Sequence, residues 1–329
     1  MRIIDMHTHV WDLPSAEFPW HAPVKPLTYG RVRNEPPGQP STESQLLSPS
    51  FAQSVAPAEM LLRFMDWAEV ERAAILPSFL HGFDNRYIAA CAKRWPDRFW
   101  GFGAVDLMSD ELLSQASLAV DGLGLHGLYG WPTDGERGVW FDDHQLTPFW
   151  KQVERWGVPV TMHISTLRRR ADLLGWPHLP HQAYYHQIAQ LGRVAEQHPR
   201  VRILIDHLGD PVVDEEPPHR TYRELLSLAR FPNFFLKISA LSYFSQQEFP
   251  YVDVHAFIRK AAGAFGPDRL LWGSDFPGTL LRCTYRQTID SVRTACDQLG
   301  DEAQAAIFGG AAASLMDPVS PARPDTRIG

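Results

Sequence analysis

Short runs of apolar residues recur along the chain, and polar or glycine-rich segments bound each run. Such runs predict buried β-strands, because strands of globular proteins are short and rich in branched and aromatic side chains. Eight of them cover residues 3–10, 73–77, 99–105, 124–129, 159–164, 201–207, 234–239 and 270–275.

A different period occupies the segments between the strands. In residues 57–70, for example, Met60, Leu61, Phe64 and Met65 fall on one face of a helix. Helices are expected at residues 57–70, 85–95, 110–120, 143–156, 181–197, 221–229, 254–265, 285–299 and 302–315.

The alternation of strands with helices predicts parallel strands joined by right-handed crossovers. Eight such units favour a closed (β/α)8 barrel of the α/β class, expected as a single domain over residues 1–317. A doubly wound open sheet is the alternative, but no Gly-x-Gly-x-x-Gly follows the first strand. The Pro-rich residues 318–329 are expected to be a C-terminal tail.

Residues 11–56 lack a sustained period and are rich in Pro, Ser and Gly. An irregular loop of this length inside a compact domain is typically either a functional lid or disordered. We expect a packed, lid-like insertion after the first strand, because the stretch contains the aromatic residues Trp11, Phe18, Trp20, Tyr29 and Phe51.

Composition and charge narrow the classes of partner that the protein is expected to bind. The chain has 329 residues, a net charge of −7 and no basic run, so we expect a small-molecule substrate and no nucleic acid. No apolar run approaches membrane-spanning length and no leader precedes the first strand, so we expect no membrane segment and no signal peptide. The three cysteines lack metal-site spacing, which suits free thiols in the cytoplasm. Monomer and homodimer both remain open.

Polar residues gather where the predicted strands end. In the first strand, His7 and His9 are two residues apart and should leave one face together with Asp5. Active sites of such barrels lie at the carboxyl ends of the strands, so these residues should share a rim with residues from later strands. Asp206 should alternate to the other side of its strand. The residues expected at the rim are His163, His207, Lys237, Ser239 and Asp275.

Each of these residues has a structural interpretation when taken alone, because strand-end histidines commonly form structural hydrogen bonds and aspartates commonly cap helices. Together, four histidines and one aspartate at the ends of four strands predict a metal site. Mixed imidazole and carboxylate ligands favour Zn²⁺, with Mn²⁺ and Fe²⁺ as alternatives.

Five segments make the chain resemble the amidohydrolase-related branch of the amidohydrolase superfamily, where they occur in the same order. That branch contains aminocarboxymuconate-semialdehyde decarboxylase, resorcylate decarboxylases, and lactonases of pyrone-dicarboxylates and sugars. The resemblance spans the whole barrel. The segments are Ile4-Asp5-Met6-His7-Thr8-His9, Thr161-Met162-His163, Ile205-Asp206-His207-Leu208-Gly209, Leu236-Lys237-Ile238-Ser239 and Leu271-Trp272-Gly273-Ser274-Asp275-Phe276-Pro277.

The resemblance implies a role for each matching residue. His207 would act as acid/base or polarise the substrate carbonyl. Residues 125–131 hold neither the lysine nor the glutamate that bridges two metals in many members, which favours one divalent metal. A metal-free site, as in some lactonases of the branch, is the alternative. The residues that would hold the metal or its bound water are His7, His9, His163 and Asp275.

A metal held by imidazoles and a carboxylate activates water and polarises a carbonyl. Together with the resemblance, this chemistry implies a metal-dependent hydrolase of a lactone, ester or amide in a small carboxylated or aromatic substrate, with Asp275 as general base. The Leu208-Gly209-Asp210-Pro211 run resembles lactonase members. Non-oxidative decarboxylation of an aromatic or muconate-type acid is one alternative, and a barrel that only binds a small molecule is another.

Substrate contacts are predicted near the same rim. Arg168 and Arg169 follow the fifth strand and would clamp a carboxylate, and Arg282 lies beyond the eighth strand. The alternatives are a solvated loop for each arginine and core packing for each aromatic residue. The residues that would form an aromatic wall are Tyr129, Trp131 and Trp11.

Overall fold

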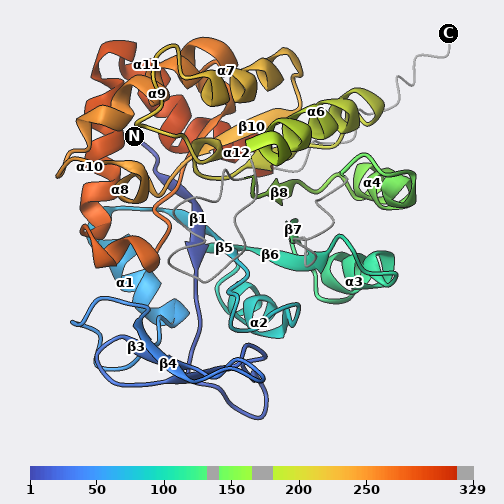
Figure 1. Cartoon of the computed structure of the whole chain (residues 1–329), viewed down its shortest axis with the longest axis vertical. Coiled ribbons are helices and arrows are strands. Elements are labelled where there is room, and N and C mark those ends of the chain that lie inside the picture. Colours follow the sequence, from blue (N-terminus) through green and yellow to red (C-terminus); the bar gives the residue numbers. More distant parts are fainter. Residues whose placement is uncertain (132–140, 165–180, 317–329) are drawn as a thin grey trace, which may run out of the picture.

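The structure of the protein is a computed structural model that describes residues 1–131, 141–164 and 181–316. Eight parallel strands follow one another around a single sheet in chain order (Figure 1). Each overlaps one of the predicted strands. They are β1 (Ile4–His9), β5 (Arg72–Leu76), β6 (Phe99–Asp106), β7 (Gly127–Trp131), β8 (Val160–Met162), β9 (Ile203–Ile205), β10 (Phe234–Ile238) and β11 (Leu270–Trp272).

The sheet closes on itself between β1 and the segment that follows β11. The backbone N–H of Asp275 donates to the carbonyl of His7 at 2.8 Å, and the N–H of His9 donates to the carbonyl of Phe276 at 2.7 Å. A parallel bridge joins Thr8 to Phe276 at the same place. The predicted (β/α)8 barrel is therefore confirmed.

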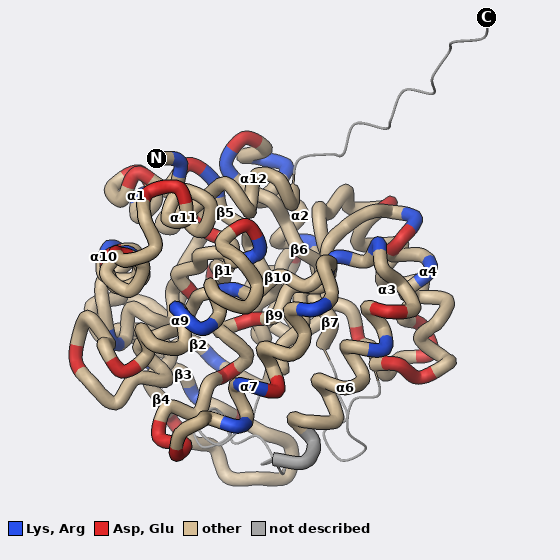
Figure 2. The backbone as a smooth tube through the Cα atoms, turned by 90° about the horizontal axis from the view of Figure 1, so that it is seen from above, with Lys and Arg blue, Asp and Glu red and all other residues tan. Residues whose placement is uncertain are grey.

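Helices surround the barrel, as Figure 1 and the view from above in Figure 2 show. The predicted helix over residues 302–315 is divided by a π-helical turn at Ala306–Gly310. The α-helices in the described residues are α1 (Ala58–Ala68), α2 (Arg86–Arg94), α3 (Leu112–Ser117), α4 (Thr147–Trp156), α6 (His181–Gln197), α7 (Arg220–Leu226), α8 (Leu241–Phe244), α9 (Val252–Phe265), α10 (Tyr285–Cys296), α11 (Asp301–Ala305) and α12 (Ala311–Met316).

Acidic and basic positions alternate along the described backbone in the view of Figure 2. Within the described ranges, no helix has both the length and the apolar character needed to cross a membrane.

Two apolar cores hold the barrel together. The larger fills the space between the strands and the helices. The smaller fills the barrel interior with side chains such as Met6, Leu76 and Phe102, and Ala312 and Leu315 of α12 pack against it. Because apolar side chains fill the interior, the polar groups gather at the carboxyl ends of the strands.

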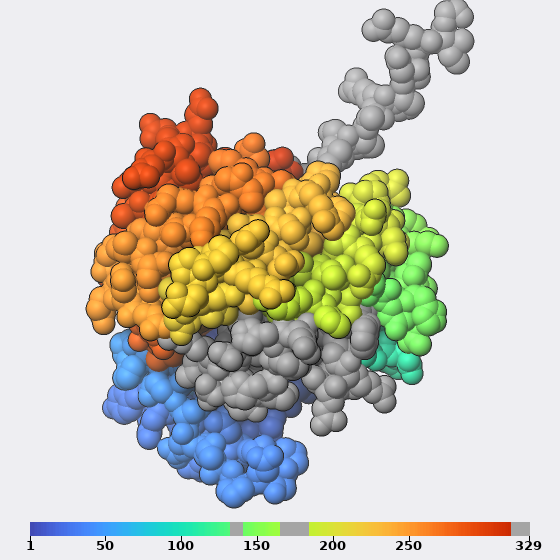
Figure 3. Space-filling model, turned by 45° about the horizontal axis from the view of Figure 1, so that its top comes forward, coloured from blue at the N-terminus to red at the C-terminus, as the bar shows by residue number. Residues whose placement is uncertain are grey.

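Residues 11–56 contain a small antiparallel sheet, which forms the blue end of the molecule in Figure 3. The expectation of an irregular stretch is wrong here, because surface strands of three or four residues carry no apolar alternation that a sequence pattern could reveal. The strands are β2 (Val24–Pro26), β3 (Arg31–Asn34) and β4 (Thr42–Gln45).

The insertion is attached to the loop that follows β5. The N–H groups of His21 and Ala22 both point to the carbonyl of Leu80, at 2.7 and 3.2 Å. The insertion therefore lies by the carboxyl end of β5. Its function as a lid stays a prediction, and the predicted tail at 318–329 lies outside the described residues.

Candidate metal centre

A β-bulge interrupts β1 between Asp5 and Thr8. Asp5 pairs with Ala73 of β5, whereas Thr8 pairs with Ile75, so β1 advances further along the chain than its partner does. β1 thus holds an extra residue. A bulge of this kind shifts the side chains that follow it to the opposite face of the sheet.

The bulge turns the two histidines into the barrel. Met6 and His7 face the interior in succession, and His9 follows on the same side. Asp5 faces the helices, where its carboxylate accepts a hydrogen bond from Tyr285 of α10 at 2.7 Å. The prediction that Asp5 shares a face with the histidines is wrong, because the pairing of β1 with β5 is not visible in β1 alone.

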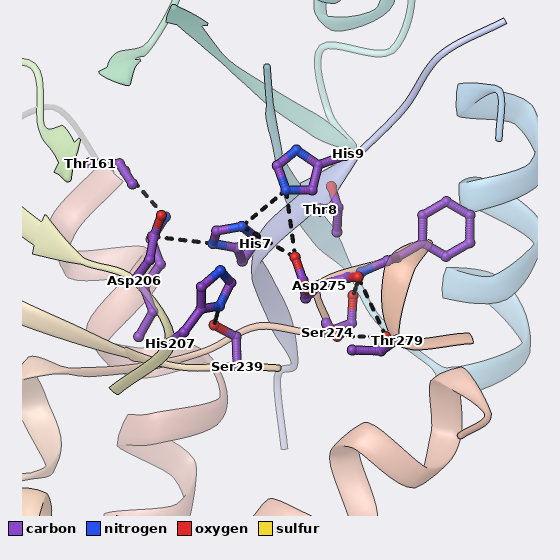
Figure 4. A network of polar contacts seen from close by, with 12 residues as sticks. His7, Thr8, His9, Thr161, Asp206, His207, Ser239, Ser274, Asp275 and Thr279 are labelled. Atoms are coloured by element: carbon purple, nitrogen blue, oxygen red, sulfur yellow. Dashed lines mark hydrogen bonds and ion pairs between the residues drawn. The ribbon is translucent and has the colours of Figure 1, made fainter. Parts of the chain in front are cut away.

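His7, His9 and Asp275 bring three donor atoms together at the carboxyl end of the barrel (Figure 4). The two Nε2 atoms lie 3.1 Å apart, and Oδ1 of Asp275 lies 3.4 Å from Nε2 of His7 and 3.5 Å from that of His9. The ligands of a tetrahedral zinc ion, with bonds of about 2.0–2.1 Å, are separated by about 3.3 Å. The three atoms therefore fit one face of such a site.

Contacts on the far side of each ring orient the donor atoms. Nδ1 of His9 lies 2.9 Å from the carbonyl of Pro77, which can only accept, so Nδ1 carries a proton and Nε2 is the nitrogen left to bind a metal. Nδ1 of His7 lies 3.2 Å from the Asp206 carboxylate, which favours the same tautomer. Burial lowers the pKa of His7 to about 4, so its imidazole is neutral near pH 7.

Two imidazole nitrogens and a carboxylate oxygen thus face one another at 3.1–3.5 Å, along the dashed lines of Figure 4. A cation between them would be attracted by all three atoms. The residues present therefore fit a divalent metal, which imidazole and carboxylate ligands commonly bind.

A buried ion pair lies beside His7. The carboxylate of Asp206 and the ammonium of Lys237 are fully buried and lie 3.1 Å apart, and the ammonium also donates to Oγ1 of Thr161 at 3.1 Å. Burial alone would raise the pKa of Asp206, but Lys237 and His7 hold that pKa well below its usual range. Asp206 therefore stays ionised next to His7.

The prediction that Asp206 points away from the site is wrong. β9 ends at Ile205, and the backbone turns directly afterwards, with φ of 51° at His207 and 55° at Leu208. Leu204 faces the barrel interior, and Asp206, two residues later in extended backbone, lies on the same side. The positive φ at His207 then breaks the alternation, so His207 reaches the centre as well. Asp275 also has a positive φ of 58°. Backbone strain of this kind costs about 1–3 kcal/mol per residue and clusters at functional sites.

The two other predicted histidines lie next to each other but have different contacts. Nδ1 of His207 lies 2.8 Å from Oγ of Ser239, and its ring centroid lies 4.4 Å from that of His7. His163 follows β8, and its ring centroid lies 5.5 Å from that of His207. Nε2 of His163 lies 3.4 Å from Oδ2 of Asp210. His163 is therefore turned toward a carboxylate of its own.

Two groups of residues, within the described part of the chain, bring donor atoms close enough together to share one ion. His7 belongs to both and His163 to neither. The role of His163 as a metal ligand stays a prediction. The groups are His7–His9–Asp275 and His7–Asp206–His207.

The predicted aromatic wall is divided between the rim and the core. Tyr129 and Trp131 are half-buried on the same face of β7, with ring centroids 6.0 Å apart, and Trp131 also meets Phe83. Trp11 is buried in the core, where its indole N–H donates to the carbonyl of Ser54 at 2.8 Å. Its position matches the core-packing alternative.

The predicted arginines are placed only in part. Arg282 is exposed, and its Nη1 donates to the carbonyl of Ser242 at 3.2 Å. Arg168 and Arg169 lie outside the described residues. Their roles as carboxylate clamps stay predictions.

The pairing of Lys237 with Asp206 was not expected, although the sequence carries a signal for it. Lys237 lies within the apolar strand β10, and lysine is almost never fully buried unless it is paired. The end of the neighbouring strand in the barrel supplies Asp206, the carboxylate that a buried lysine needs. Asp5 had no comparable signal, because its position depends on the bulge.

The chain is similar to known enzymes along the whole barrel. The profile of the Amidohydrolase family matches residues 4–317. An L-fucono-1,5-lactonase of Burkholderia ambifaria is 27% identical over 312 residues, which cover 93% of this chain and 92% of that protein. A gamma-resorcylate decarboxylase of Rhizobium sp. is 28% identical over 209 residues, which cover 57% of this chain and 62% of the decarboxylase.

A solved structure shares the fold. An amidohydrolase from Burkholderia multivorans, with bound zinc, superposes with a TM-score of 0.67 at 19% sequence identity. The superposition covers 96% of this chain and 99% of that one.

Proposed function

The chain belongs to the amidohydrolase family, and from that premise we propose that it is a metal-dependent hydrolase that opens a small lactone. The observation that carries the proposal is the group formed by His7, His9 and Asp275, in which a carboxylate faces two imidazole nitrogens 3.1 Å apart. The similarity to a lactonase over 93% of the chain supports a lactone as the substrate class.

One divalent metal, zinc before manganese or iron, would be held by His7, His9 and Asp275. When bound, it would lower the pKa of a water molecule and polarise the substrate carbonyl. A single ion is supported by Lys237, whose buried ammonium lies 3.1 Å from Asp206 and already balances its charge. His163 is kept as a proposed further ligand.

Asp275 is the proposed general base. Its carboxylate would take a proton from the attacking water and later deliver it to the ring oxygen that leaves. His207 would bind the carbonyl oxygen of the substrate. The hydroxyl of Ser239, 2.8 Å from Nδ1, can donate to that nitrogen, which leaves a proton on Nε2 to stabilise the charge that develops on the carbonyl oxygen.

The remaining contacts follow from position. Trp131 and Tyr129 would contact the substrate ring from β7. Arg282, with Arg168 and Arg169, would bind a carboxylate on the substrate. The described cysteines are free thiols, which supports the cytoplasm as the proposed location.

Decarboxylation of an aromatic acid is a second candidate, favoured by the similarity to a gamma-resorcylate decarboxylase. In that reaction the protein would protonate the ring carbon that loses CO₂, and Asp275 in its acid form is the proposed donor. The matched region covers 57% of the chain, against 93% for the lactonase, so hydrolysis comes first.

Two product assays on the same zinc-loaded protein decide between the reactions. Acid release is measured with sugar and pyrone lactones, and CO₂ release with dihydroxybenzoates. We expect acid release from a lactone, its loss on chelation and its return with zinc. Release of CO₂ alone would select decarboxylation. Neither product from a metal-loaded protein would contradict both.

Replacing the proposed base gives the sharpest test of the mechanism. Asp275→Asn should lower kcat by about a hundred- to ten-thousandfold, because an amide cannot take the proton from water. The matched control is Asp143→Asn, at an exposed helix start where asparagine caps equally well, and its kcat should not change. An Asp275→Asn protein that keeps a tenth of wild-type kcat would rule out Asp275 as the base.

A further inference from the structure

We propose that Asp5, which lies outside the reacting centre, is a positioning residue that sets the relative placement of His7, His9 and Asp275. The inference rests on the proposed metal-dependent function. It concerns how the protein builds the metal-binding group rather than which substrate is used.

The bulge is required for the histidines to face the interior. Ile4 and Met6 point into the barrel. Without the extra residue, strict alternation would continue inward at Thr8 and would send His7 and His9 toward the helices. The two imidazoles therefore reach the centre only because the register of β1 shifts between Asp5 and Thr8.

Asp5 holds the bulge in place. A bulge leaves a backbone group outside the regular ladder, and Oδ1 of Asp5 accepts the backbone N–H of His7 at 3.1 Å. The Asp5 side chain is fully buried, so no solvent competes for this bond. The carboxylate thus determines the direction in which the chain leaves the bulge at His7.

The same carboxylate binds the other half of the centre. Oδ1 of Asp5 also accepts the backbone N–H of Ser274 at 2.9 Å, and Oδ2 accepts the hydroxyl of Tyr285 at 2.7 Å. The next residue, Asp275, donates its own N–H to the carbonyl of His7. Figure 4 shows Asp275 facing His7, with Ser274 next to Asp275.

Asp5 therefore joins the two segments that supply all three donor atoms. β1 carries His7 and His9, and the segment after β11 carries Asp275. The segments are close enough that a Cβ added to Gly273 would lie 2.7 Å from Cβ of His7. A loss of the Asp5 bonds should change the separation of the imidazoles from the Asp275 carboxylate, on which tight metal binding depends.

Zinc affinity of the metal-stripped, folded protein tests the inference without using substrate. Competition against a chromophoric chelator gives the Kd. Asp5→Ala should weaken zinc binding by about 10- to 100-fold, the usual effect of losing a group that orients a ligand. Asp5→Asn should keep most of the affinity, because its amide oxygen can still accept both backbone N–H groups.

The matched control is Asn85→Ala. Asn85 is also buried and bonds two backbone groups of one residue, the N–H of Ala104 at 2.7 Å and its carbonyl at 3.0 Å, on the strand β6. Its loss should lower the unfolding temperature but leave the zinc Kd unchanged. If Asp5 had only a structural role, Asp5→Ala would likewise lower the unfolding temperature and leave the zinc Kd unchanged. The zinc Kd therefore distinguishes a positioning role from a purely stabilising one.

Three outcomes are decisive. A weaker Kd in Asp5→Ala, with recovery in Asp5→Asn, supports the inference. An unchanged Kd in folded Asp5→Ala overturns it while leaving the proposed function intact. A wild-type protein that binds no zinc, manganese or iron overturns the proposed function and the inference with it. If Asp5→Ala does not fold, Asp5→Ser replaces it with the same expectation, because a serine hydroxyl is too short to accept both N–H groups.

Discussion

At the scale of single residues, the two histidines of β1 differ in the acceptor that lies next to their Nδ1 atoms. Nδ1 of His9 faces the neutral carbonyl of Pro77, and Nδ1 of His7 faces the charged carboxylate of Asp206. A carboxylate partner raises the basicity of an imidazole more than a carbonyl does. Of the two proposed metal ligands, His7 should therefore bind the ion more strongly, and Asp206 should influence the ion through His7.

The partner of Asp206 can be tested by removing its charge. Lys237→Met should destabilise the protein by about 3–5 kcal/mol in urea unfolding, because it leaves a fully buried carboxylate without its cation. The control is Lys25→Met, whose exposed ion pair with Glu35 should contribute at most about 1 kcal/mol. A loss below about 1 kcal/mol for Lys237→Met would mean that Asp206 is not ionised in the folded protein.

A second residue-scale prediction concerns His81, a buried histidine stacked on Tyr87. Burial lowers the pKa of His81 to about 4 from 6.5. The unfolded chain therefore binds this proton at a higher pH than the folded protein, and stability is lost as the pH falls from 6.5 to 4, by up to about 3 kcal/mol.

His81→Phe removes the titrating group and keeps the stacked ring. The free energy of unfolding, measured between pH 8 and pH 4, should fall less steeply for His81→Phe than for the wild type. Equal slopes for the two proteins would show that His81 protonates alike in the folded and unfolded chains.

At the scale of elements, the strands and helices were predictable because burial is periodic. Both faces of each barrel strand are covered, so strands such as Leu270–Trp272 appear as continuous apolar runs. The register shift in β1 was not predictable, because it is a property of the pair β1 and β5. The short surface strands in residues 11–56 were missed, because neither face of them is buried enough to produce a pattern.

The residues of the predicted site also divide into those that the sequence placed correctly and one that it did not. His7, His9, Asp275 and His207 were placed at one rim from strand ends alone, and the structure brings them together. Asp206 was misplaced, because it was expected to alternate with His207, whereas the positive φ at His207 ends the alternation there and brings both side chains to the centre. No sequence pattern marks that point. Side-chain alternation is reliable only while the strand continues.

The close approach of β11 to β1 gives a prediction about elements. Gly273→Ala would place a Cβ 2.7 Å from Cβ and 3.0 Å from the backbone N of His7, and should cost about 1–3 kcal/mol. Gly263→Ala, in α9 with no atom near the added Cβ, should instead stabilise by up to about 1 kcal/mol. Equal denaturant midpoints for the two variants would contradict the close approach.

At the scale of the whole molecule, the barrel interior is layered along its axis. Apolar side chains such as Phe102 form the lower layer. The ammonium of Lys237 lies 5.8 Å from the Phe102 ring and pairs with Asp206, which touches His7 in turn. The buried ion pair therefore lies between the apolar layer and His7 of the proposed metal-binding group.

Metal removal should therefore affect the whole protein and not only its activity. Zinc at a hundred times its Kd should stabilise the folded protein by about 2.7 kcal/mol, because only the folded chain brings the donor atoms together. The unfolding temperature, measured with chelator and with added zinc, should rise on zinc addition in the wild type. It should not rise in His9→Ala, and a rise there would place the ion elsewhere.

The bond from Ser274 to Asp5 spans 269 residues of chain. During synthesis, residue 5 leaves the ribosome long before residue 274 does. β1 can therefore pair with β5 before the segment that follows β11 exists. The centre cannot assemble on an incomplete chain, whatever metal the cell supplies. Metal capture by the proposed group should therefore follow completion of the chain, and a chain that ends before β11, which lacks Asp275, should bind zinc more weakly than the full-length protein.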